Sequence, residues 1–164
     1  MNEQLAALDE VAAALDRARI DYWLFGGWAV DFHAGAVTRE HDDVDLAIWL
    51  DDMPRIQPLL EADGWHDLAD PDTDGGIALG RGGVRLELTY LYRSDDGEIY
   101  TPLRDGSRGK WPVTAIGADL RMLDGVTCRV LSLGSLTWMK SHGRDDPRYS
   151  AKDSADASVL RRLS

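Results

Sequence analysis

Two aspartates inside an apolar run carry the strongest chemical signal in the sequence. Asp43 and Asp45 open the segment DVDLAIWL, in which apolar residues alternate with acidic, small or aromatic ones. This period of two predicts a β-strand over 43–50, with both carboxylates on one face and their Cα atoms about 6.6–6.8 Å apart. Charges are costly in a buried strand unless they bind something. Because Mg²⁺ prefers oxygen ligands and keeps waters that phosphates can replace, the pair is typical of a site for a metal and a nucleotide.

A third acid would complete such a site, and Glu87 is the candidate. It interrupts the apolar strand expected over 84–92, on the polar face of that strand. If a neighbouring strand places Glu87 opposite Asp43 and Asp45, the three carboxylates could hold two Mg²⁺ ions about 3.5–4 Å apart. Such ions activate an attacking hydroxyl and stabilise a leaving pyrophosphate. Glu87 could instead serve as a general base, or form a salt bridge on an exposed sheet face.

A pair of glycines lies fifteen residues before the aspartates. Gly26 and Gly27 separate the apolar segment YWLF, an expected strand, from a stretch with helical spacing over 28–33. A strand that turns into a helix through two glycines lets backbone N–H groups approach phosphate oxygens, with the positive end of the helix directed at them. We therefore predict that Gly26 and Gly27 bind nucleotide phosphates while the acids bind metal.

The elements that must position these residues follow from periodicity and turn residues. We predict an amphipathic helix to about Arg19, a strand over 22–25, a helix over 28–33 ended by Gly35, a helix from Asp51 or Asp52 to Gly64, a hairpin of strands 76–81 and 84–92, a strand over 126–132, and helices over 136–144 and 150–163. Pro58 predicts a kink or a late start in its helix. The polar, turn-rich segment 93–112 is predicted to be a surface loop over a substrate site.

This order of elements predicts an α+β fold, a mixed β-sheet flanked by helices with a C-terminal helical section. A chain of 164 residues is long enough for one domain with a full core, so we expect a single domain over 1–164. Its core would cover about 1–131 and its C-terminal helices about 132–164.

Composition limits the partners of this chain. Its formal charge is −11 and its pI about 4.6, so the mean field repels polyanions and attracts metal ions and amine-bearing small molecules. The single cysteine, Cys128, is expected to be a buried strand residue without a catalytic role. No apolar run approaches the roughly 20 residues of a membrane span, and the N-terminus is acidic, so we expect a cytoplasmic protein.

The segment GGWAVDFHAGAVTREHDDVDLAI resembles the nucleotidyltransferase superfamily with the DNA polymerase β-type fold. The signature of that superfamily is a hydrophobic strand, Gly-Gly or Gly-Ser, a short helix, Asp-hydrophobic-Asp and a later isolated acid. The combination of Gly-Gly-Trp, Thr-Arg and His-x-Asp-hydrophobic-Asp is more closely similar to the aminoglycoside 2''-adenylyltransferase and lincosamide nucleotidyltransferase branch. The resemblance implies metal-dependent transfer of a nucleoside monophosphate, usually AMP from ATP, to a hydroxyl group. It makes Asp43 and Asp45 metal ligands and places Glu87 at the third acidic position, where relatives often have Asp.

The C-terminal segment LTWMKSHGRDDPRYSAKDSAD also resembles minimal nucleotidyltransferases, including toxin-type members that modify tRNA. This resemblance implies that Lys140 neutralises triphosphate charge and that Asp153 orients Lys140 or a neighbouring cation. Arg39 is a further candidate for phosphate binding. Two structural alternatives stay open: Lys140 could be an exposed helix residue, and Asp153 could form a capping box with Ser150.

Other residues near the motif have structural interpretations. Asp42 is expected to start the strand, and His41 to be a hydrogen-bonding loop residue. The six tryptophans are expected to lie mostly in the core, although Trp28, Trp49 or Trp111 could stack on a base or sugar.

The sequence therefore predicts a nucleotidyltransferase that uses Mg²⁺ and an NTP, ATP first, and a small cationic hydroxylated acceptor of the aminoglycoside type. The first alternative is a toxin-type enzyme that modifies tRNA, which the negative charge opposes. The second is a non-catalytic nucleotide-binding module, which the intact Asp43, Asp45 and Glu87 oppose.

Overall fold

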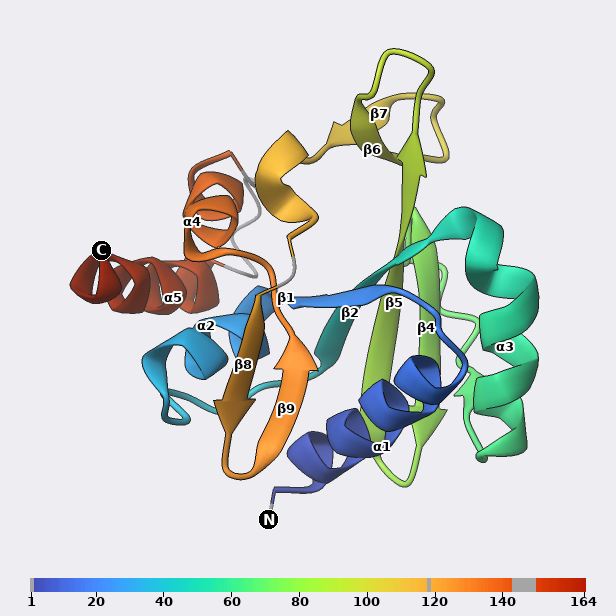
Figure 1. The fold of residues 1–164 in the computed structure, drawn as a ribbon, viewed down its shortest axis with the longest axis horizontal. Coiled ribbons are helices and arrows are strands. Elements are labelled where there is room, and N and C mark those ends of the chain that lie inside the picture. Colours follow the sequence, from blue (N-terminus) through green and yellow to red (C-terminus); the bar gives the residue numbers. More distant parts are fainter. Residues whose placement is uncertain (1, 118, 143–149) are drawn as a thin grey trace.

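A mixed β-sheet organises the chain in the computed structural model, which describes residues 2–117, 119–142 and 150–164 (Figure 1). The helices are α1 (Glu3–Arg17), α2 (Gly26–Ala34), α3 (Met53–Ala62), α4 (Leu133–Ser141) and α5 (Ser150–Leu163), with 3-10 turns η1 (Leu50–Asp52) and η2 (Val113–Ala115). The strands are β1 (Tyr22–Phe25), β2 (Val44–Trp49), β3 (His66–Asp67), β4 (Gly76–Arg81), β5 (Val84–Arg93), β6 (Ile99–Pro102), β7 (Arg108–Lys110), β8 (Leu120–Leu123) and β9 (Val126–Arg129). The predicted α+β fold with a mixed sheet is confirmed.

The strand order fixes which residues meet. The sheet runs β1-β2-β5-β4-β3, and β6 and β7 extend it from β5. β2 and β5 pair in parallel, whereas β1 pairs with β2 and β4 with β5 in antiparallel fashion. The register places Glu87 beside Asp45 on one side and Phe25 beside Asp45 on the other. The predicted juxtaposition of the two acidic strands is therefore present in the sheet.

The helices lie in different parts of the molecule. α4 and α5 lie side by side at one end of the molecule and contact α2, α3 lies at the other end, and α1 lies between them and contacts β5, β9 and α3 (Figure 1). α1 forms as predicted, because its apolar residues recur every three or four positions and are buried, among them Leu5, Leu8 and Leu15. The side chain of Asn2 caps its first turn by accepting from the N–H groups of Gln4 and Leu5.

The late start at Pro58, one of two alternatives for that helix, and the loop expected over 93–112 are wrong. α3 does not start late at Pro58 but begins at Met53 and continues through it. Pro58 is exposed, and the helix buries Ile56 and Leu60 on its other face, so only one intrahelical hydrogen bond is lost. The segment 93–112 is not a loop, because the buried Ile99 and Thr101 lie in β6, which pairs with β5 and β7.

The hairpins and C-terminal elements complete the core. β4 and β5 form the predicted hairpin, whose two turn glycines have positive φ. β9 was predicted, whereas its partner β8 was not. Cys128 is buried in β9, and this burial raises the pKa of its thiol to about 12. Within the described ranges, no helix is long and apolar enough to cross a membrane.

Candidate active site

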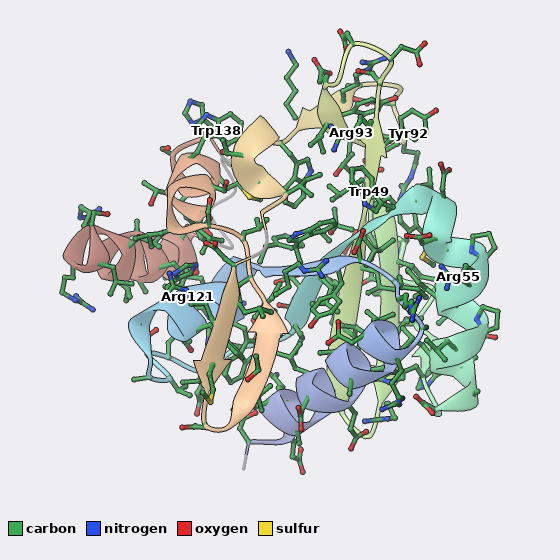
Figure 2. All side chains as sticks on the ribbon, in the orientation of Figure 1. Trp49, Arg55, Tyr92, Arg93, Arg121 and Trp138 are labelled. Atoms are coloured by element: carbon green, nitrogen blue, oxygen red, sulfur yellow. The ribbon has the colours of Figure 1, made fainter. Side chains whose placement is uncertain are left out.

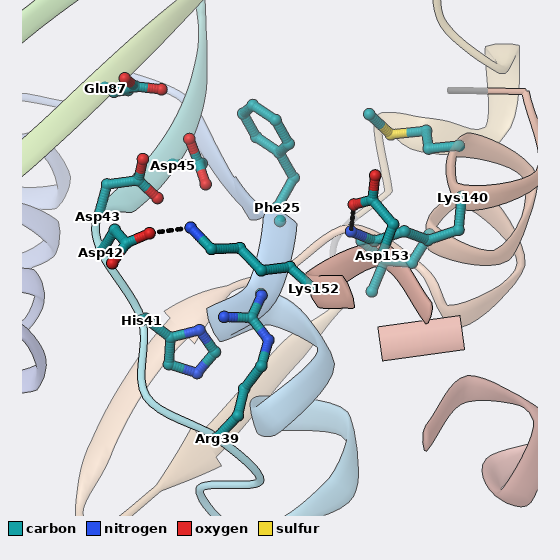
Figure 3. A pocket seen from close by; sticks show the side chains of 14 residues that line it. Phe25, Arg39, His41, Asp42, Asp43, Asp45, Glu87, Lys140, Lys152 and Asp153 are labelled. Atoms are coloured by element: carbon teal, nitrogen blue, oxygen red, sulfur yellow. Dashed lines mark hydrogen bonds and ion pairs between the residues drawn. The ribbon is translucent and has the colours of Figure 1, made fainter. Parts of the chain in front are cut away.

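A cavity of about 300 Å³ lies where the ends of β1, β2 and β5 face α4 and α5 (Figure 3). Fourteen of the residues that the structure describes line it: Phe25, Gly26, Gly27, Arg39, His41, Asp42, Asp43, Asp45, Glu87, Leu136, Met139, Lys140, Lys152 and Asp153. All eight site residues that the sequence predicted are in this set. Their individual roles stay predictions, but the structure brings them to one pocket.

The three predicted metal ligands converge. Each of Asp43, Asp45 and Glu87 offers a carboxylate oxygen within 4.8 Å of the oxygens offered by the other two. Asp45 and Glu87 are neighbours in the parallel pair β2–β5, and Asp43 precedes β2 by one residue. We call these three residues the acid cluster. An all-carboxylate donor set of this size fits Mg²⁺, a hard cation that takes oxygen ligands.

The acid cluster is electrostatically unfavourable by itself. The pKa of Asp45 is raised well above its usual value, first by burial and then by the charges of Asp43 and Glu87. A divalent cation between the carboxylates would remove this repulsion. The fit of the cluster to a metal therefore depends on its charge as well as on its geometry.

Glu87 also has the salt bridge that the sequence left open as an alternative. Arg85 donates from Nε to Oε1 of Glu87 at 2.9 Å, and its Nη2 lies 2.8 Å from the same oxygen. Nη2 also donates to Asp70 Oδ2 at 2.6 Å. The two interpretations are compatible, because Arg85 orients Glu87 while the carboxylate still belongs to the acid cluster.

The two glycines leave space for charged side chains. Gly26 begins α2 with φ +71°, and a Cβ there would lie 2.4 Å from Asp45 Oδ2. A Cβ on Gly27 would lie 2.4 Å from Arg39 Nη2 and 2.5 Å from His41 Nδ1. The strand-to-helix turn thus brings backbone close to an acid on one side and to a cation on the other.

The opposite side of the pocket holds ion pairs of alternating charge. Arg39 donates from Nε and Nη2 to the two carboxylate oxygens of Asp156, at 2.9 and 3.0 Å. Lys140 Nζ lies 3.0 Å from Asp153 Oδ1 and 3.0 Å from Asp156 Oδ2 (the contact with Asp153 is drawn in Figure 3). We call these four residues the paired network.

The paired network tests one of the two structural alternatives. The side chain of Lys140 is only 18% exposed, so Lys140 is not an exposed helix residue. The capping box of Asp153 depends on the side chain of Ser150, and the structure describes only the backbone of that residue.

Sequence reasoning missed Asp156, which is fully buried on α5. A signal for it existed, since Asp156 follows Asp153 by three residues and so shares its helix face. The net effect of Arg39 and Lys140 outweighs the cost of burial and lowers the pKa of the Asp156 carboxyl.

A second buried aspartate supports the loop that carries the motif. Asp31 on α2 is fully buried and accepts from Thr38 N at 3.1 Å, and its Oδ2 lies 2.5 Å from His41 Nε2. The His41 ring packs on Trp28 with 4.5 Å between centroids. The expectation that His41 is a hydrogen-bonding loop residue is confirmed.

An apolar wall of the pocket comes from Phe25, Leu136 and Met139 rather than from a tryptophan. Trp28 and Trp111 are buried, and Trp49 packs on Trp23 and beneath Arg93 (Figure 2). None of the three tryptophans considered for stacking lines the cavity. Most of the six are core residues, as predicted, and Trp138 is the most exposed at 37% (Figure 2).

The rim of the pocket carries one more pair of charges. Lys152 on α5 reaches across to Asp42, and both side chains line the cavity (Figure 3). Asp42 is exposed and is not part of the acid cluster. The expectation that it starts the strand is wrong, because β2 begins two residues later at Val44.

Comparison with known proteins connects this geometry to an enzyme family. A family model described as aminoglycoside-2''-adenylyltransferase matches residues 7–155. Over 135 residues, which are 82% of this chain and 71% of the relative, the chain is 32% identical to a 2''-aminoglycoside nucleotidyltransferase of Escherichia coli. A protein of the same description from Klebsiella pneumoniae is 34% identical over 135 residues, which are also 82% of this chain and 71% of that relative.

Two solved structures have the same fold. The crystal structure of ANT(2'')-Ia in complex with adenylyl-2''-tobramycin has a TM-score of 0.76 at 20% identity, and the match covers 99% of this chain and 91% of that one. The lincomycin-bound lincosamide adenylyltransferase LnuA has a TM-score of 0.75 at 19% identity, and the match covers 100% of this chain and 99% of that one. These similarities confirm the predicted nucleotidyltransferase fold.

Proposed function

The chain belongs to the aminoglycoside-2''-adenylyltransferase family, whose matched relatives are nucleotidyltransferases, and we propose that it transfers AMP from magnesium–ATP to a hydroxyl of a small cationic acceptor. The observation that supports this proposal is the acid cluster of Asp43, Asp45 and Glu87 at a diglycine turn, in a pocket that Arg39 and Lys140 also line. The proposal treats residues 1–164 as one nucleotidyltransferase domain that acts in the cytoplasm, where ATP is present.

Each side of the pocket has its own part in the reaction. Asp43, Asp45 and Glu87 would hold two Mg²⁺ ions, which supply positive charge to the attacking and leaving oxygens. Arg39 and Lys140 bind the triphosphate from the opposite side. The backbone at Gly26 and Gly27, at the N-terminus of α2, approaches the phosphate oxygens.

The transfer is an in-line displacement at the α-phosphorus. The acceptor oxygen forms a bond to this phosphorus while the bond to the bridging oxygen of the β-phosphate breaks, and pyrophosphate leaves. Glu87, held in place by Arg85, takes the proton of the acceptor hydroxyl. Arg39 and Lys140 stabilise charge on the phosphate oxygens, including charge on the leaving pyrophosphate.

The charge of the pocket supports a cationic acceptor. Among the described residues, five carboxylates line it (Asp42, Asp43, Asp45, Glu87 and Asp153) against three cationic side chains (Arg39, Lys140 and Lys152). A negative pocket in a protein of charge −11 attracts amines and repels a polyanion such as tRNA. Tobramycin, which one structural neighbour binds in adenylylated form, is therefore the first acceptor to test.

A pyrophosphate-release screen tests the proposal. Purified protein is incubated with magnesium, each NTP in turn, and tobramycin, other aminoglycosides, lincomycin or total tRNA, beside the Asp45→Asn variant. We expect release with ATP and an aminoglycoside, the matching adenylylated product by mass spectrometry, and no release with the variant. Labelled tRNA with unmodified aminoglycosides would overturn the proposal, and a signal that Asp45→Asn leaves unchanged would exclude the acid cluster as its source.

A further inference from the structure

Asp156 lies behind the pocket, in contact with two of the residues that line it, and the proposed reaction gives it no role. It lies on α5 and is fully buried, and its two oxygens contact both cations of the paired network. Burying a carboxylate is costly unless partners compensate it, so this position needs a physical reason.

The contacts of Asp156 fix the orientation of the Arg39 guanidinium. Nε and Nη2 bind the two oxygens of Asp156 in a bidentate arrangement, and Nη1 donates to the carbonyl oxygen of Glu40 at 2.8 Å. This arrangement holds Nη2 directly beside Gly27, since a Cβ there would lie 2.4 Å from it. The guanidinium is therefore fixed at the glycine turn that we propose for phosphate binding.

The same carboxylate fixes the second cation. Lys140 Nζ lies between Asp156 and Asp153, at 3.0 Å from an oxygen of each. Because Lys140 comes from α4, Asp156 from α5 and Arg39 from the loop after α2, one buried group sets the relative position of three elements. Without it, Arg39 and Lys140 would lose the one carboxylate that contacts both of them among the described residues.

We propose that Asp156 is a positioning residue that holds Arg39 and Lys140 in the orientation that binds the polyphosphate of the nucleotide. Asp156 does not touch the ligand but acts through the two cations. The inference rests on the proposed function, because it assigns the phosphates to this side of the pocket. A purely structural Asp156 would only attach α5 to α2 and α4.

The test uses magnesium tripolyphosphate, a probe with the phosphates of the nucleotide but without base, ribose or acceptor. Its binding is measured by calorimetry for the wild type, for Asp156→Asn and for Val159→Ala. Val159 is buried on the same helix and has no polar side-chain group, so its truncation weakens α5 without changing the ion pairs. We expect Asp156→Asn to weaken binding about tenfold or more, as loss of a supporting partner does at other charged sites, and Val159→Ala to leave it unchanged.

Two further variants show whether the effect passes through the cations. In a background where Arg39 and Lys140 are both changed to Gln, Asp156→Asn should cause no additional loss. Asp156→Glu keeps the charge but moves the carboxylate by one methylene, so it should bind the probe less tightly than the wild type and more tightly than Asp156→Asn. If Asp156→Asn does not fold, wild-type affinity in Asp156→Glu overturns the inference. In the transfer assay, the KM for magnesium–ATP should rise while the KM for the acceptor stays unchanged.

The inference is overturned if Asp156→Asn binds the probe like the wild type, if Val159→Ala loses as much affinity, or if the wild type does not bind the probe. The proposed function fails separately. If the probe binds with the expected pattern of variants but no acceptor is adenylylated, the assigned reaction is wrong and the positioning role stands.

Discussion

The two sides of the pocket, the acid cluster and the paired network, differ in how their charges are compensated. The acid cluster places three carboxylates with oxygens within 4.8 Å of one another, whereas the paired network alternates two carboxylates with two cations at 2.9–3.0 Å. The first arrangement is unfavourable until a cation arrives, and the second is satisfied within the protein. This difference supports the proposal that the acid cluster binds a metal ion and that the paired network holds Arg39 and Lys140 for phosphate binding.

The pKa shifts follow the same division. Burial, followed by the charges of Asp43 and Glu87, raises the pKa of Asp45. Burial also opposes ionisation of Asp156, but Arg39 and Lys140 outweigh it and lower the pKa of that carboxyl. Asp→Asn substitutions on the two sides should therefore have opposite effects on stability.

The largest expected effect is on transfer by Asp45→Asn. Removing one carboxylate of the acid cluster should reduce kcat by at least about 100-fold, because charge at the reacting phosphate is no longer stabilised. Without metal, the melting temperature should stay the same or rise, because repulsion is relieved. Asp51→Asn is the control, since Asp51 is exposed and does not line the cavity. Equal loss of activity in both variants would contradict the assignment.

Asp156→Ala should have the largest effect on stability. It leaves two cations with side-chain exposures of 20% and 18% without their shared carboxylate, and we expect a loss of about 3 kcal/mol in the free energy of unfolding. Urea unfolding of Asp156→Ala beside Asp45→Asn measures the contrast directly. A destabilisation by Asp45→Asn as large as that by Asp156→Ala would break the comparison between the two sides.

The Asp43–Asp45 pair of the acid cluster could be predicted from the sequence because a local rule determines it. Alternation places Asp43 and Asp45 on one face, and one parallel strand pairing then brings Glu87 beside Asp45. The paired network could be predicted only in part. Arg39 and Lys140 were identified by resemblance, but the role of Asp156 depends on a contact with Arg39, 117 residues away in the chain.

The missed strands have a similar explanation. β6 and β7 lie in a segment whose turn residues dominate its composition, and they are strands because β6 pairs with β5 and β7 pairs with β6. β8 exposes Leu120 and Met122, so it lacks the alternation of a half-buried strand. Alternation of apolar and polar residues predicts a strand when one face of the strand is buried. It does not predict a strand that is stabilised mainly by pairing with a neighbouring strand.

A comparison of Gly26 with Gly35 distinguishes the cost of a positive φ from the steric effect of a new Cβ on the acid cluster. Gly26 and Gly35 have φ of +71° and +74°, but a Cβ at Gly35 meets nothing within 4 Å, whereas one at Gly26 meets Asp45. Changing either to Ala should cost about 1–2 kcal/mol of stability through φ alone. Only Gly26→Ala should also lose magnesium binding and transfer, because it displaces Asp45. Calorimetry with magnesium and an ATP analogue distinguishes them, and loss of magnesium uptake in Gly35→Ala would contradict the steric argument.

The smallest effect concerns the pH dependence of stability without metal. The pKa of Asp45 is raised in the folded protein, so the fold binds more protons there than the unfolded chain, and the acid cluster destabilises increasingly as pH rises above about 4. The pKa of Asp156 is lowered, so its contribution is present above about pH 4 and is lost as pH falls through its folded pKa. In the presence of a chelator, the melting temperature of Asp45→Asn should therefore increase relative to that of the wild type as pH rises. The difference by which Asp156→Asn melts below the wild type should become smaller as pH falls below about 4. Parallel curves for the three proteins would mean that the two sides of the pocket do not differ in their charge balance.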